Sequence, residues 1–105
     1  QEPTRLMIEA LEPTIVWEIN KQKIEDLAAT YEELGRLYRR VFENSLIESQ
    51  IKADTLRFEP ASGRYAKLLQ IHPEILKRAP LVYVASLLQM TPETLSRVRS
   101  AHLNA

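Results

Sequence analysis

Cysteine is absent from this chain of 105 residues, and glycine occurs only twice. The lack of cysteine excludes disulfides and thiolate metal ligands, and it fits a reducing cytosol. The chain has no run of about 18 apolar residues, the minimum for a transmembrane helix. No signal-peptide pattern stands at its start. These absences predict a cytoplasmic protein without a membrane partner, and the length of 105 residues predicts one domain or parts of two.

Charge is balanced over the whole chain but unevenly distributed along it. Residues 1–59 hold eight Lys/Arg and twelve Asp/Glu, whereas residues 60–105 hold six and two. The second part therefore carries a net charge of +4, which favours a polyanionic partner. Four of its basic residues are candidates for contacts to backbone phosphate, although solvated surface is the simpler interpretation of each: Arg64, Lys67, Lys77 and Arg78.

Residues 1–19 have the alternation of a β-hairpin, with two apolar runs separated by Glu12-Pro13. The alternating residues are Leu6, Ile8, Ala10, Ile15, Trp17 and Ile19. An isolated two-stranded hairpin is marginal in water, so these strands need a larger sheet. We therefore expect them to be the last strands of a β domain that precedes Gln1.

Residues 20–57 predict a short helix and then a long one, because Thr30–Leu56 lacks proline and contains only Gly35 as a helix breaker. The long helix would measure roughly 40 Å, more than a globule of this size can cover. It either packs within its own domain or pairs with a twin helix across a two-fold axis. The second interpretation uses a stripe at spacings of three and four: Tyr38, Phe42, Leu46, Ser49, Ala53 and Leu56.

Residues 58–105 predict several short helices, opened or ended by Pro60, Pro73 and Pro80. The last helix has a well-defined start, since Thr91 is a good N-cap and Pro92 fits the first helical position. The apolar residues of the last two helices are Val84, Leu88, Met90, Leu95 and Val98, with the small Ala85 at the expected crossing.

Two short helices joined by a tight turn describe a helix-turn-helix, whose second helix enters the DNA major groove. A generic pair of core helices would show the same pattern. The turn commonly has glycine at the position of Gln89, because that residue often takes a positive φ. Gln89 in that conformation costs about 1 kcal/mol.

The stretch SGRYAKLLQIHPEILKRAPLVYVASLLQMTPETLSRVR resembles the C-terminal region of bacterial Crp/Fnr-type transcription regulators, above all the branch common in Bacteroidetes. The stretch IEALEPTIVWEINKQKIEDL is similar to the end of that family's cyclic-nucleotide-binding β-roll and the short helix after it. The long helix matches the family's dimerisation helix. The resemblance implies a mainly α fold: a dimerisation helix, then a winged-helix-like domain with its wing reduced or absent, and a short hairpin left from the β-roll.

The family's recognition helix implies DNA contacts within residues 91–100. Glu93 and Arg97 match positions that read base edges, where a carboxylate accepts from cytosine N4 and an arginine binds guanine O6 and N7. Thr94 matches a phosphate contact, and Pro92 replaces a base-contacting arginine of some members. The residues expected to contact double-stranded DNA are Thr91, Glu93, Thr94, Ser96, Arg97 and Arg99.

Cyclic AMP is not expected as a cofactor, and the effector stays unknown. Members that respond to cyclic AMP carry an Arg-Ser or Arg-Thr pair, but PTRL places Thr4 or Pro3 at the arginine position. Arg5 comes one or two places late, and one step reverses the face of a strand. The family's other ligand contacts would fall near Ser49 and Gln50, whose simpler interpretation is as seam or surface residues.

Catalysis has little support in the sequence. His72 and His102 are far apart, and no carboxylate cluster has metal-ligand spacing, so neither a metal site nor an enzyme is expected. We expect His72 to cap or end a helix and His102 to lie at a frayed end. Two functions remain: a homodimeric, sequence-specific regulator of transcription, with RNA polymerase as a further partner, or a helical oligomerisation and adaptor module that binds an acidic protein.

Overall fold

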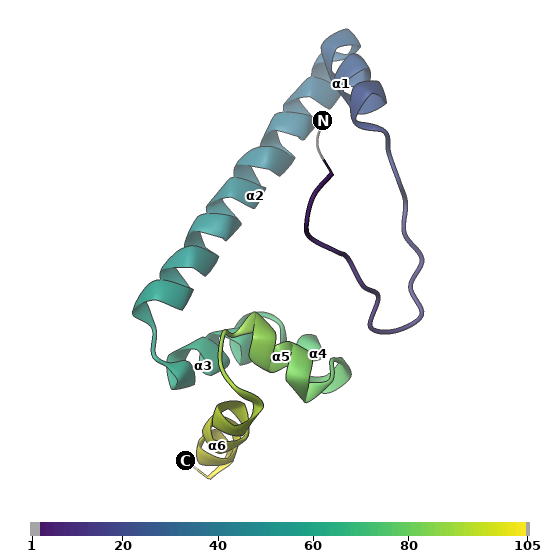
Figure 1. The fold of residues 1–105 in the computed structure, drawn as a ribbon. Helices are drawn as coiled ribbons and strands as arrows, with labels where there is room; N and C mark the ends of the chain where they lie inside the picture. The colour runs from purple at the N-terminus through teal and green to yellow at the C-terminus, as the bar shows by residue number, and fades with distance from the viewer. Residues whose placement is uncertain (1–2, 105) are drawn as a thin grey trace. The chain divides into compact units, whose positions relative to one another are not determined.

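The computed structural model describes residues 3–104, which form six helices and contain no strand. The chain is therefore mainly helical, as predicted (Figure 1). The helices are α1 (Lys21–Thr30), α2 (Glu32–Phe58), α3 (Ala61–Ile71), α4 (Pro73–Arg78), α5 (Leu81–Leu87) and α6 (Pro92–Leu103). The chain divides into two compact units, Gln1–Tyr38 and Arg39–Ala105. Within residues 3–104, no helix combines the length and apolarity needed to cross a membrane.

The segment of residues 3–20 is irregular, and all of its residues are exposed. The hairpin predicted for residues 1–19 is thus not formed over the part of it that the structure describes, and residues 1 and 2 lie outside that part. The physical reason is that two strands alone have neither a third strand to pair with nor an apolar face to cover. Short local bonds occur instead, such as that from the Leu6 backbone N–H to Thr4 Oγ1 at 3.1 Å.

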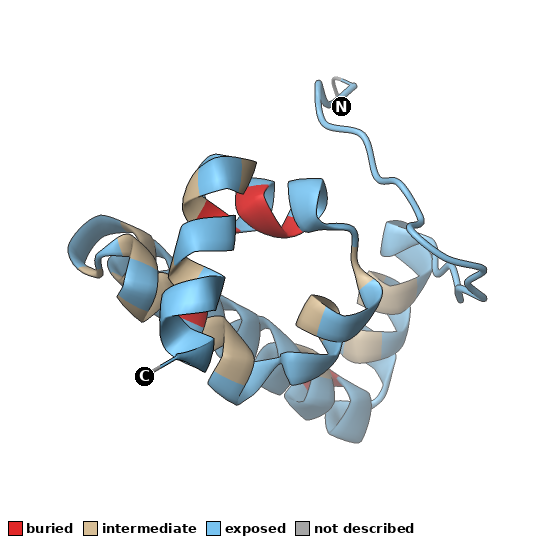
Figure 2. Ribbon diagram, turned by 90° about the horizontal axis from the view of Figure 1, so that it is seen from below, coloured by how far each residue is buried: buried red, intermediate tan, exposed pale blue. Residues whose placement is uncertain are grey.

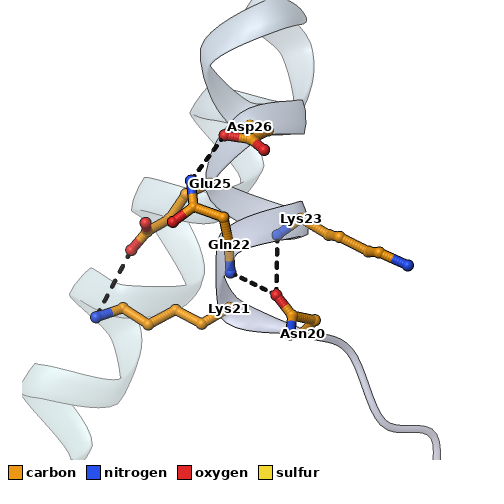
Figure 3. A network of polar contacts seen from close by, with 6 residues as sticks. All are labelled: Asn20, Lys21, Gln22, Lys23, Glu25 and Asp26. Carbon is orange, nitrogen blue, oxygen red and sulfur yellow. Dashed lines mark hydrogen bonds and ion pairs between the residues drawn. The ribbon is translucent and has the colours of Figure 1, made fainter. Parts of the chain in front are cut away.

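Helix α1 is held by interactions with near neighbours in the sequence, which Figure 3 shows. Asn20 caps it, because its Oδ1 accepts from the backbone N–H groups of Gln22 at 2.9 Å and Lys23 at 3.3 Å. One turn on, Gln22 Nε2 donates to Asp26 Oδ1 at 2.9 Å. None of the ten residues of α1 is buried. The helix therefore depends on its cap and on neighbouring side chains rather than on a core.

Helix α2 confirms the long helix predicted from the absence of proline. It has 27 residues, about 40 Å at the usual rise, and it begins and ends two residues later than predicted. Its first turn carries Glu32 and Glu33 and its last turn Arg57, charges that match the two ends of the helix dipole. Gly35 is its one buried residue. Most of the apolar surface of α2 is therefore exposed in the single chain.

The helices α3 to α6, which we call the head, contain the hydrophobic core. The core consists of Tyr65, Val84, Ala85, Leu88 and Leu95, which are at most 6% exposed and appear in red in Figure 2. Helix α3 packs against α4 and α6, and α5 packs against the same two helices. Met90 and Val98 are half-buried against this core. The apolar residues named for the last two helices, and Ala85, therefore all lie in the core or against it.

Candidate nucleic-acid interface

The turn between α5 and α6 has a specific backbone geometry. Gln89 takes a φ of 54°, the conformation for which glycine is usual at this position of the turn. The N–H of Gln89 donates to the Ser86 carbonyl at 3.1 Å, and the N–H of Met90 donates to the Ala85 carbonyl at 3.0 Å. This pair of bonds is a Schellman motif, which ends a helix by satisfying carbonyls that lack partners within it. The motif accounts for the strained backbone of Gln89. A left-handed residue directly after the helix turns the chain back, so that the next N–H groups reach the last helical carbonyls.

Arg64 holds the same turn from the neighbouring helix. Its Nε donates to the Leu88 carbonyl at 2.8 Å, and its Nη1 donates to the Glu59 carbonyl at 2.9 Å. The Leu88 carbonyl is one of those left without a helical partner at the end of α5. The guanidinium therefore ties the start of α3 to the turn. This finding corrects the interpretation of Arg64 as solvated surface or a phosphate contact, because its side chain is half-buried and engaged by the backbone.

The other three basic residues considered with Arg64 differ among themselves. Lys67 lies 3.4 Å from Glu59 Oε1 and donates to Thr55 Oγ1 at 3.4 Å, so it also links α3 to the end of α2. Lys77 and Arg78 are exposed in the last turn of α4, where cations suit the helix dipole.

The start of α6 is fixed by the capping that the sequence predicts. Thr91 Oγ1 accepts from the backbone N–H of Thr94 at 3.1 Å, and it also lies 2.9 Å from the Thr94 hydroxyl. Pro92 occupies the first turn, and Glu93 is its acidic residue. Leu95 is fully buried and anchors the helix to the core. The cap and the anchor together set which side of α6 is turned to solvent.

The predicted DNA contacts do not all lie on one side of α6. Glu93 and Arg97 are exposed and one turn apart, about 40° from each other around the helix, and Ser96 lies beside Glu93. Arg99 is also exposed but follows Leu95 by one turn, about 160° from Arg97. Thr94 is half-buried and already engaged with Thr91. The structure therefore brings together Glu93, Ser96 and Arg97, which we call the outer triad, and places Arg99 on another side.

The arginine of the outer triad has no partner among the described residues. Neither Arg97 nor Arg99 forms a hydrogen bond or an ion pair with another residue in the described range 3–104. A hollow of about 380 Å³ borders Arg97 and is lined by Ser62, Arg97, Val98, Ala101 and His102. The Arg97 guanidinium is thus free to bind an acceptor outside the chain.

Both histidines lie at helix ends, as the sequence predicts. His72 ends α3 and precedes α4, as expected, and its Nδ1 lies 3.1 Å from Glu74 Oε1. The pKa of Glu74 is lowered, first by a hydrogen bond from its own backbone N–H and then by His72. His102 packs its ring edge-on against Tyr65, with centroids 5.4 Å apart. His102 thus lies exposed at the end of α6, as expected, and the contact of its ring with Tyr65 was not predicted. Among residues 3–104, no cluster of three potential metal ligands occurs.

The predicted dimer seam lies along α2, and most of it is open to solvent. Leu46 is 72% exposed and Phe42 is 58% exposed, whereas Tyr38 and Leu56 are half-buried. Ser49 and Ala53 are exposed. Gln50 next to them donates to Asp54 Oδ1 at 3.3 Å, as an ordinary surface residue does.

Comparison with protein-family models, curated proteins and solved structures finds no match to this chain.

Proposed function

We propose that the protein is a cytoplasmic, sequence-specific DNA-binding regulator of transcription of the Crp/Fnr type that acts as a homodimer. In this proposal α5 and α6 form the helix-turn-helix, and α6 is the recognition helix. The observation that carries the proposal is the outer triad on a capped helix that follows a Schellman turn. A recognition helix contacts base edges mainly with its N-terminal residues, and two of the three triad members lie in the first five residues of α6.

The chemistry of the outer triad suits base edges. Arg97 presents a fork of donors that fits guanine O6 and N7, and Glu93 presents acceptors for cytosine N4. Residues one turn apart are about 5–6 Å from each other at Cβ, a separation that long side chains can adapt to neighbouring bases about 3.4 Å apart. Arg99, on another side of α6, is better placed for a backbone phosphate than for the bases that Arg97 would read.

The exposed stripe of α2 supports the homodimer. Leu46 is largely exposed in the single chain, and a helix of 27 residues has more apolar surface than the head covers. Pairing two copies along this stripe would give two recognition helices for half-sites about 34 Å apart. RNA polymerase is a further partner in this proposal, and cyclic AMP is not its effector.

Selection from a random duplex pool at near-physiological salt tests the proposal. We expect recovery of an inverted repeat whose half-sites are about one helical turn apart. Arg97→Lys keeps the charge but loses the bidentate fork, so it should relax the preference at one G·C pair by about 1–3 kcal/mol. Arg40→Lys, at an exposed position of α2, is the matched control and should leave the selected sequence unchanged.

Two other results would count against the proposal. Sequence-independent binding that falls steeply with salt would mean that the head is only a basic surface. No retention of DNA by a protein that dimerises in solution would favour the second candidate, a helical adaptor that binds an acidic protein. In that case Arg97→Lys should barely change partner binding, because a point charge serves an acidic surface as well as a fork does.

A further inference from the structure

A groove of about 480 Å³ lies within the second unit, bordered by α2, α3, α4 and α5. Its lining is largely apolar, with Ile51 and Leu56 from α2, Leu68 and Ile71 from α3, and Leu87 from α5. Ile71 is 60% exposed and Ile51 is 53% exposed, so apolar surface is open to solvent inside a concave site. The volume falls within the range of about 300–1,000 Å³ that small-molecule sites occupy.

The charged side chains in the groove are mostly cationic. Lys52, Arg64 and Lys67 line it, and Glu48 is its single carboxylate. Arg64 is engaged by two backbone carbonyls. Lys67 has an ion pair whose two side chains are 44% and 37% exposed, and such exposed pairs contribute little. Lys52 has no hydrogen bond or ion pair with any residue in the described range. Lys52 therefore offers an unpaired ammonium group to an anion, and Lys67 offers one that is held only by an exposed ion pair and a hydrogen bond to Thr55.

The groove uses a different side of α2 from the predicted dimer seam. At about 100° per residue, Ile51 lies about 160° and Lys52 about 100° from Ala53 of the seam. Leu56 is the one residue that belongs to both sets. If two copies pair along the seam, the groove therefore stays open to solvent and can bind another molecule.

We propose that the groove binds an amphipathic anion, namely an aliphatic carboxylate. The hydrocarbon chain lies along the apolar lining, and the carboxylate pairs with the ammonium groups of Lys52 and Lys67. A small inorganic anion would leave the apolar lining uncovered, and an uncharged hydrocarbon would leave the Lys52 ammonium group without a partner. The site is independent of DNA binding by α6, so either proposal can fail while the other stands.

Calorimetric titration with three probes tests the site, with decanoate kept below its micellar concentration and decanol below its solubility limit. Decanoate has both the chain and the carboxylate, decanol has the chain alone, and acetate has the carboxylate alone. We expect saturable one-to-one binding of decanoate, binding of decanol at least ten-fold weaker, and no binding of acetate. Amide shifts in a two-dimensional NMR titration should be largest around Leu68, Ile71 and Leu87.

Matched variants locate the binding. Lys52→Gln and Lys67→Gln should each weaken decanoate binding about two- to five-fold, because each removes one partly exposed charge pair. Ile71→Glu places a like charge in the groove at an exposed position and should abolish binding. Lys77→Gln and Ile47→Glu are the controls, since both residues are exposed and lie outside the lining.

Several outcomes would overturn the proposal. Equal binding of decanol and decanoate would remove the role of the cations, and unsaturable binding would show partition onto exposed apolar surface. Equal losses in the groove variants and the controls would mean that the groove is not the site. If Ile71→Glu instead changed the oligomeric state in sedimentation while decanoate failed to bind, the groove would be an interface between copies of the chain.

Discussion

The segment of residues 3–20 and the head use similar apolar residues in opposite ways. In the segment, Ile8 is fully exposed and Trp17 is 94% exposed. In the head, Leu95 is completely buried and Val84 is 2% exposed. The head contains four helices whose apolar sides cover one another, whereas the segment has no second surface to pack against. The difference teaches that an apolar pattern forms a core only where the chain supplies both sides of the contact.

The largest expected difference in stability is between truncating a buried leucine of the head and truncating an exposed isoleucine of the segment. Leu95→Ala should lower the free energy of unfolding by about 3 kcal/mol, because it removes a fully buried side chain and leaves a cavity. Ile8→Ala should change it by less than about 0.5 kcal/mol. Urea denaturation followed by far-UV circular dichroism measures both. Equal losses would show that residues 3–20 are packed in solution.

Because a small head can lose its fold entirely, a milder truncation accompanies Leu95→Ala. Val84→Ala should cost roughly 2 kcal/mol, since it removes fewer buried methyl groups. Unchanged stability in both head variants would contradict the assignment of the core.

The next largest difference in stability is expected between two arginines. Arg64 of the head donates to backbone carbonyls, whereas Arg5 of the segment is exposed. Arg64→Met keeps most of the aliphatic stem but leaves the Leu88 and Glu59 carbonyls without their donor, so it should cost about 2 kcal/mol. Arg5→Met should be neutral. Thermal unfolding with both variants at one protein concentration is the measurement. A stable Arg64→Met protein would mean that water replaces the guanidinium without loss.

A smaller effect separates the two helix caps. Thr91→Ala removes the acceptor for the Thr94 N–H and should lower the stability of the head by about 1 kcal/mol. Asn20→Ala removes a similar cap from α1, but α1 has no buried residue, so the loss should be local fraying. Hydrogen exchange should therefore rise over the head in the first variant and only over α1 in the second. Head-wide exchange in Asn20→Ala would refute this separation.

The smallest effect has the opposite sign. Gln89→Gly relieves a left-handed conformation but adds chain entropy to the unfolded state, so it should stabilise the head by about 0.5 kcal/mol. Gln70→Gly, at an exposed position inside α3, should destabilise it by roughly 0.5–1 kcal/mol. Chemical denaturation of both variants compares the two signs. Destabilisation by Gln89→Gly would show that the glutamine side chain holds the turn.

Local signals in the sequence predicted much of the helical structure. The absence of proline predicted α2, and Thr91 with Pro92 predicted the start of α6. Both predictions use only residues that follow one another in the sequence, and local rules of helix propensity and capping describe such residues well.

What the sequence missed depends on distant contacts or on the angle around a helix. Arg64 meets a carbonyl 24 residues away, and His102 meets the ring of Tyr65. No local pattern reports such pairs. Arg99 was expected on the DNA-contacting face of the last helix, yet the helical period places it about 160° from Arg97. The alternation of residues 3–19 did not give strands. The alternation is a local signal, but a strand forms only where a partner strand is present.

Trp17 is the single tryptophan of the chain, and it lies in water within the segment rather than in the head. Its fluorescence should therefore already have the red-shifted emission of a solvated indole and should change little when the head melts. Circular dichroism and fluorescence would then report on different parts of one molecule. Any partner that covers residues 3–20 would shift the emission to the blue, which gives the least folded region its own built-in optical reporter.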